Sequence, residues 1–168
     1  MSQLHLSSDA SLLVRDGRGR YRPASPEQIL AAARRVVDDK MRRGDKFSTP
    51  TEVKTYLRAK LAGFDHEVFA VLFVDAQNRL VEYVEMFRGT IDGTTVHARE
   101  VVKEALRCNA AAAIFSHNHP SGNAVPSAAD REVTQRLADA LALVDVRTLD
   151  HIVVAGDTTT SFVERGLL

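Results

Sequence analysis

The sequence predicts a mixed α/β fold of the α+β kind, in which helices flank a single mixed β-sheet. Hydrophobic residues recur at helical spacing in some stretches and form short β-branched runs in others, which indicates helices and strands along the same chain. The chain has 168 residues, of which 45% are hydrophobic. This length and composition suit one domain with a buried core, preceded by a short N-terminal helical segment.

Two stretches precede the main domain. Residues 1–24 are predicted to form an irregular N-terminal lead-in, and residues 25–47 a helical segment. Ser25 and Pro26 are typical of a helix N-cap and of the first helical position. Hydrophobic residues at helical spacing follow, and Gly44 ends the pattern.

The main domain is predicted to span residues 48–168 and to begin with a helix from Ser48 to Gly63. Residues 67–74 are rich in β-branched and aromatic side chains and almost entirely apolar, which indicates a central strand. A polar turn then leads to a hairpin partner over residues 80–87.

The second half of the domain combines helices and strands. A helix is predicted over residues 99–107, and the alanine-rich run after it fits either a buried strand or a helix end that leads into one. Proline and glycine then mark a loop, after which Ser127 begins another helix. Residues 150–155 and 161–163 are predicted to close the sheet.

The stretch Ser116–Gly122 contains two histidines, His117 and His119, separated by one residue. Side chains alternate along a strand, so both rings can point the same way from an extended chain. Asp130 follows in the first turn of the next predicted helix. Two imidazoles and one carboxylate make a three-ligand site that leaves a position open for water, as in catalytic rather than structural zinc sites.

Each part of this pattern also has a simpler interpretation. Ser127 and Asp130 have the spacing of a capping box, in which the aspartate only satisfies backbone N–H groups or the helix dipole. An isolated pair of histidines is weak evidence for a metal, and His151 fits either a metal ligand or a hydrogen-bonded structural histidine. The combination of two histidines and Asp130 at this spacing favours a metal site.

The pattern His117-x-His119-Pro120, then six residues, Ser127, two residues and Asp130 resembles the JAMM signature of JAB/MPN-domain metalloproteases. The run His117–Gly122 is similar to the RadC branch of that superfamily, and the resemblance extends from about residue 48 to the C-terminus. It implies the JAB/MPN (cytidine-deaminase-like) architecture. We expect the short form, without the N-terminal helix-hairpin-helix segment of longer RadC-like proteins.

The resemblance also implies a zinc-dependent metallohydrolase of the JAMM type. Zn²⁺ held by His117, His119 and Asp130 would activate a water molecule for cleavage of a peptide or isopeptide bond. The historical association of the family with DNA repair leaves an alternative, which is a noncatalytic or accessory metal-binding module in DNA transactions.

Hydrolysis of an amide needs a general base, and the family supplies a carboxylate from a strand upstream of the histidines. Glu82 and Glu85 are three positions apart on the predicted hairpin strand, so they face opposite sides of a regular strand. We prefer Glu85, which stands close to where the family glutamate falls, with a β-bulge shifting its phase. The resemblance also implies that Ser127 hydrogen-bonds the oxyanion.

Composition narrows the class of partner. The formal net charge is zero, which argues against strong nucleic-acid binding, and the N-terminal arginines fit a solvated tail better than a DNA contact. No apolar run is long enough to span a bilayer, and the N-terminus lacks the pattern of a secretory signal. With the single cysteine, Cys108, these features predict a cytoplasmic protein that acts on a peptide or protein substrate. The oligomeric state stays open.

Overall fold

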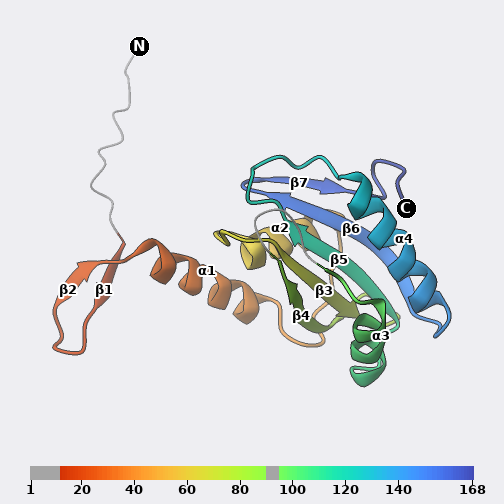
Figure 1. Ribbon diagram of the computed structural model, residues 1–168. Helices are drawn as coiled ribbons and strands as arrows, with labels where there is room; N and C mark the ends of the chain where they lie inside the picture. Colours follow the sequence, from red (N-terminus) through yellow and green to blue (C-terminus); the bar gives the residue numbers. More distant parts are fainter. Residues whose placement is uncertain (1–11, 90–94) are drawn as a thin grey trace, which may run out of the picture.

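Five strands form one mixed sheet at the centre of the molecule (Figure 1), and the computed structural model describes residues 12–89 and 95–168. The strands are β3 (Val68–Val74), β4 (Leu80–Arg88), β5 (Ala112–Asn118), β6 (Arg147–Ala155) and β7 (Thr158–Ser161). Their order in the sheet is β4-β3-β5-β6-β7. Neighbouring strands are antiparallel except β5 and β6, which are parallel. This sheet confirms the predicted fold class.

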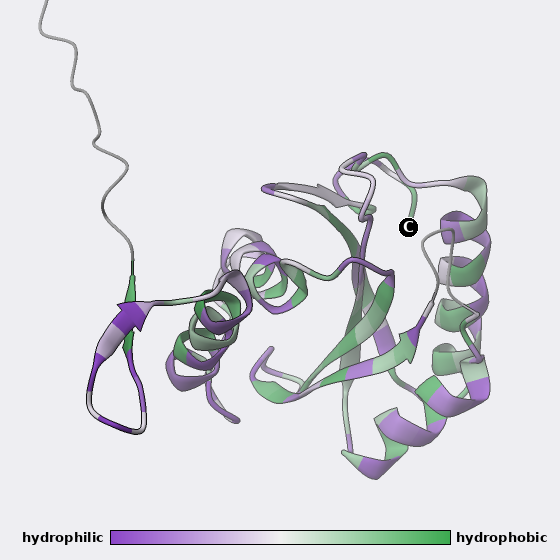
Figure 2. Cartoon of the chain, turned by 60° about the vertical axis from the view of Figure 1, so that its left-hand side comes forward, coloured by the Kyte–Doolittle hydropathy of each residue, from purple (hydrophilic) through white to green (hydrophobic). Residues whose placement is uncertain are grey.

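Helices cover both faces of the sheet. The helix α2 (Pro50–Leu61) packs on one face, and α3 (Ala98–Arg107) and α4 (Ala128–Ala142) pack on the other. All seven residues of β3 are buried between the two halves of the core, which explains its continuous apolar sequence. Figure 2 shows hydrophilic and hydrophobic residues alternating along the covering helices, as expected when each buries one side. None of the helices in the described part of the chain is long and apolar enough to cross a membrane.

The N-terminal helix α1 (Pro26–Lys40) begins as the sequence predicts. The Ser25 side chain accepts a hydrogen bond from the backbone N–H of Gln28, and the Gln28 side chain accepts one from Ser25, which completes a capping box. The helix ends four residues before Gly44. It packs against α2 but buries none of its residues fully, and in Figure 1 it extends away from the sheet.

A short hairpin precedes α1, where the sequence analysis predicted an irregular lead-in. The strands β1 (Leu13–Arg15) and β2 (Tyr21–Pro23) pair in antiparallel fashion. The Asp16 side chain accepts two backbone N–H groups of the turn, and Gly19 closes it at a φ of +80°. Strands of three residues are too short for an alternating pattern to reveal them. Residues 1–11 of the predicted lead-in lie outside the described residues.

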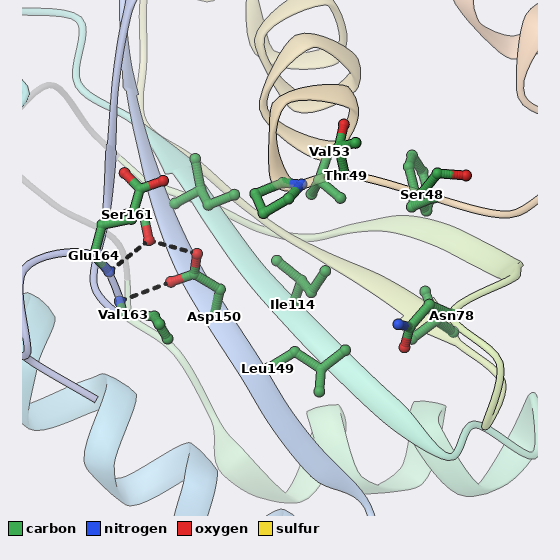
Figure 3. A pocket seen from close by; sticks show the side chains of 14 residues that line it. Ser48, Thr49, Val53, Asn78, Ile114, Leu149, Asp150, Ser161, Val163 and Glu164 are labelled. Atoms are coloured by element: carbon green, nitrogen blue, oxygen red, sulfur yellow. Dashed lines mark hydrogen bonds between the residues drawn. The ribbon is translucent and has the colours of Figure 1, made fainter.

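The last strand is shifted from its predicted position over residues 161–163, because β7 ends at Ser161. The Ser161 hydroxyl donates to Asp150 Oδ2 at 2.6 Å, and the backbone N–H of Val163 donates to Asp150 Oδ1 at 3.1 Å (Figure 3). These bonds draw the chain into a turn directly after Ser161, so that Val163 leaves the sheet.

Candidate metal centre

The structure brings together the three side chains that the sequence analysis selected as metal ligands. His117 lies at the C-terminal end of β5, His119 follows directly after the strand, and Asp130 lies in the first turn of α4. Their ligand atoms all lie within 4.8 Å of one another. His117 Nε2 is 2.9 Å from His119 Nε2 and 3.2 Å from Asp130 Oδ1, and His119 Nε2 is 3.6 Å from Asp130 Oδ2.

These separations are close to those around a tetrahedral metal ion. Zinc binds nitrogen and oxygen ligands at about 2.0–2.2 Å, which places neighbouring ligand atoms of a tetrahedron about 3.3–3.6 Å apart. The 3.2 Å between His117 Nε2 and Asp130 Oδ1 lies near this range, and the 2.9 Å between the two histidine nitrogens falls below it. His119 Nδ1 is 2.6 Å from the carbonyl oxygen of Asn123, an acceptor that requires the proton on Nδ1 and leaves the Nε2 lone pair for a metal. The triad could therefore hold a metal ion with one position open.

Ser127 and Asp130 form a capping box that also orients the ligand carboxylate. Asp130 Oδ2 accepts the backbone N–H of Ser127 at 2.6 Å and its hydroxyl at 2.7 Å, while Ser127 Oγ accepts the backbone N–H of Asp130 at 3.1 Å. The other oxygen, Oδ1, faces His117. Helix capping and a ligand role are thus compatible, because they use different atoms of the same carboxylate.

The triad also shifts the pKa values of its own members. The hydrogen bond to Asp130 raises the pKa of His119, and the Asn123 carbonyl and the negative charge of Glu67 add to this effect. Burial acts to raise the pKa of Asp130, but hydrogen bonds from His117 and His119 outweigh it and hold that pKa well below its usual range.

A cavity of about 570 Å³ lies over the triad. Its wall is made by the start of β3, by the segment before α3, by the loop between the histidines and α4, and by α4 itself. Ser127, Val133 and Arg136 line it together with the three triad residues. The cavity gives the triad access to a ligand from outside the protein.

Neither glutamate selected from the sequence reaches this cavity, so the choice of Glu85 is corrected. In the sheet, Glu85 lies opposite Ala70, and Ala70 lies opposite Ser116. His117 is the next residue along β5, so its side chain points to the other face. A bulge in the β3–β4 pairing does occur, but it falls between Glu85 and Phe87 and leaves Glu85 on the face of Ala70.

Glu82 faces the same side as His117 but lies far along the sheet. It pairs with Phe73, four residues from Phe69, the residue opposite His117. At about 3.3 Å per residue this offset is on the order of 13 Å. Glu82 instead accepts a hydrogen bond from Arg107 of α3 at 2.5 Å.

Glu67 and Glu132 also line this cavity, and the sequence analysis selected neither of them. Glu67 immediately precedes β3, lies on the cavity wall with His117 and His119, and its negative charge acts on His119. Asn118, the residue between the histidines, holds the chain on both sides of it: Asn118 Oδ1 accepts the backbone N–H of Val68 at 2.8 Å, and Asn118 Nδ2 donates to the carbonyl of His66 at 2.9 Å. A charged residue at the start of a fully apolar strand was the available sequence signal.

His151 does not belong to the ligand triad. It is fully buried on β6, and its Nε2 lies 2.8 Å from His117 Nδ1, the ring nitrogen that faces away from Asp130. Burial is the main cause that holds the pKa of His151 well below its ordinary value.

Sequence comparisons identify relatives of this chain. The sequence profile of the RadC-like JAB domain matches residues 47–167. A "UPF0758 protein" of Vibrio cholerae is 54% identical over 145 residues, which cover 86% of this chain and 91% of that protein. A further UPF0758 protein, from Methylibium petroleiphilum, is 51% identical over 168 residues, which cover 100% of this chain and 76% of that protein. Another, from Marinobacter nauticus, is 47% identical over 165 residues, which cover 98% of this chain and 74% of that protein. The chain therefore belongs to the RadC-like JAB domain family.

Proposed function

We propose that this protein is a zinc-dependent hydrolase of the JAMM type that cleaves a peptide or isopeptide bond. The observation that supports this most directly is the presence of three convergent ligands and a carboxylate, Glu67, in one cavity. The ligand set favours zinc, because two imidazoles and one carboxylate with a fourth position open are typical of catalytic zinc sites. Bound zinc supplies Lewis acidity and lowers the pKa of a coordinated water molecule to about 7.

Glu67 is proposed as the general base. Its place on the cavity wall beside His119 suits a group that takes a proton from the attacking water and later gives it to the leaving amine. The two hydrogen bonds of Asn118 to the flanking main chain support a fixed position for this residue. A carboxylate on a defined strand end is better placed for proton transfer than one on a mobile loop.

Ser127 is proposed to hydrogen-bond the oxyanion that forms on the attacked carbonyl. Its hydroxyl lies at the cavity wall but donates to Asp130 Oδ2 at 2.7 Å. Donation to an oxyanion therefore requires the hydroxyl proton to turn from Asp130 toward the substrate. The oxygen can keep accepting the backbone N–H of Asp130 during this turn, so the helix cap is retained.

The proposal is tested with wild-type protein and the double variant His117→Ala/His119→Ala, both purified with added zinc. Elemental analysis should find about one zinc per chain in the wild type and almost none in the variant. A screen of peptide and isopeptide-linked substrates should find hydrolysis by the wild type alone. Equal, near-zero zinc in both proteins would reject the site, and zinc binding without hydrolysis would favour the accessory metal-binding module.

A further inference from the structure

A buried chain of hydrogen bonds runs behind the metal ligands and joins three elements of the fold. His117 Nδ1 on β5 is 2.8 Å from His151 Nε2 on β6, and His151 Nδ1 is 2.5 Å from Thr134 Oγ1 on α4. Thr134 Oγ1 in turn donates to the backbone carbonyl of Asp130 at 2.5 Å. This series of hydrogen bonds therefore begins at the ligand His117 and ends on the backbone carbonyl of the ligand Asp130.

When His117 binds a metal through Nε2, the donors and acceptors of these hydrogen bonds can be assigned in one consistent direction. A neutral histidine that ligates through Nε2 keeps its proton on Nδ1, so His117 donates to His151 Nε2. His151 then carries its own proton on Nδ1 and donates it to Thr134, which donates its hydroxyl proton to the Asp130 carbonyl. Every donor meets one acceptor, and no proton is left without a partner.

The surroundings of His151 hold the ring in this orientation. Its ring stacks on Phe162, with centroids 4.6 Å apart and planes 21° apart. The edges of Phe69 and Phe115 meet it at centroid distances of 5.6 and 5.8 Å. His151 and Phe162 are both 0% exposed. Packing on several sides fixes the ring plane, so its two nitrogens stay aligned with His117 and Thr134.

We propose that His151 is a positioning residue of the metal site, which fixes the tautomer and the ring orientation of His117. Metal-bound histidines generally donate their second ring N–H to a carboxylate, a carbonyl or water, and His119 does so to Asn123. For His117 the acceptor is a second, neutral imidazole. The inference rests on metal binding by the triad, the first step of the proposed function.

The test measures zinc affinity by competition with a chromogenic chelator. His151→Leu should bind zinc about 10–100-fold more weakly than the wild type, which is the typical cost of losing an outer partner of a metal ligand. His151→Gln should recover most of this loss, because its amide oxygen can accept from His117 and its NH₂ group can donate to Thr134.

Ser116→Ala is the matched control. Ser116 neighbours His117 on β5, is 0% exposed, and donates to the carbonyl of Ile152 on β6 at 2.7 Å. It therefore joins the same two strands as His151 does, on the opposite face of the sheet. We expect this variant to lose stability against urea without a change in zinc affinity. An equal loss of affinity in Ser116→Ala and His151→Leu would mean that affinity follows stability, and would overturn the inference.

A second pair of variants tests the chain without touching a histidine. Thr134→Val removes the hydroxyl at similar volume and should weaken zinc binding, whereas Thr134→Ser should restore it. If His151→Leu folds, wild-type zinc affinity in that variant would overturn the inference. If it does not fold, the Thr134 pair decides, and wild-type zinc affinity in Thr134→Val would overturn the inference. Zinc binding without hydrolysis would reject the proposed hydrolase and leave the inference standing, while a wild type that binds no zinc would reject both.

Discussion

On each face of the sheet a serine hydroxyl donates to an aspartate, but the two aspartates have different neighbours. On the face of α4, Asp130 accepts from Ser127 and turns its other oxygen to His117 at 3.2 Å. On the face of α2, Asp150 accepts from the Ser161 hydroxyl and from the backbone N–H of Val163 (Figure 3), and also from the backbone N–H of His151. Asp150 thus uses one oxygen for the Ser161 hydroxyl and the other for two backbone N–H groups, whereas Asp130 keeps one oxygen directed at an imidazole.

The cavities beside these two aspartates differ in the polarity of the side chains that line them. The cavity over Asp130 has polar side chains from several elements in its wall. The pocket beside Asp150, about 240 Å³ in volume, is bordered largely by apolar side chains such as Ile114 and Leu149 (Figure 3). One serine–aspartate pair therefore lies beside two histidines that could hold a metal ion, and the other holds a turn in place through hydrogen bonds from the backbone.

The largest expected effect separates two glutamates that lie on opposite sides of the sheet. Glu67→Gln should lower turnover of any identified substrate by about 10²–10⁴-fold, because the amide cannot accept the proton from water. Zinc content should not change, since no ligand is lost. Glu85→Gln makes the same substitution on the other face and should be near neutral. Steady-state kinetics with both variants decides this, and exchanged phenotypes would restore Glu85 as the base.

Zinc affinity should distinguish the two aspartates next. Asp130→Asn can still cap α4 but is a far weaker ligand, so it should bind zinc at least about 100-fold more weakly, the upper end of the loss for an outer partner. Asp150→Asn should bind like the wild type. Isothermal titration or chelator competition measures the difference. Full affinity in Asp130→Asn would show that Asp130 is only a capping residue.

The stability of the fold should depend on Asp150, the aspartate on the face of α2, although zinc affinity should not. Asp150→Ala leaves the Ser161 hydroxyl and two backbone N–H groups without their acceptor, so the free energy of unfolding should fall by about 1–3 kcal/mol. Urea denaturation of the metal-free protein measures this loss, and zinc affinity of the folded variant should be unaffected. Unchanged stability would show that the C-terminal turn does not depend on Asp150.

The smallest expected effect is on the pH dependence of the metal-free protein. The depressed pKa of Asp130 contributes stability that is present above about pH 4 and lost as pH falls through the folded value. The raised pKa of His119 contributes stability that is complete below about pH 6.5 and lost as pH rises through the folded value. Melting temperatures of wild type and Asp130→Asn should thus differ most between about pH 4 and 6.5. A constant difference across pH would contradict the pairing.

The sequence by itself determined the features that depend on local patterns. The apolar run at 67–74 predicted a central strand because a strand buried on both faces needs an unbroken apolar sequence. Ser25 predicted the start of α1 because an N-cap is satisfied within one turn. The spacing of His117, His119 and Asp130 selected three residues that the structure brings together, since one strand end, one loop and one helix start hold all of them.

Only the tertiary structure decided which glutamate meets the histidines. Glu67 lies 50 residues before His117, and the antiparallel pairing of β3 with β5 brings the two together. The face of Glu85 depends on the register of β4 with β3, and a shift of one residue exchanges the two faces of a strand. His151 meets His117 only through the parallel pairing of β5 with β6. Contacts between distant segments follow from strand pairing, which local sequence patterns do not encode.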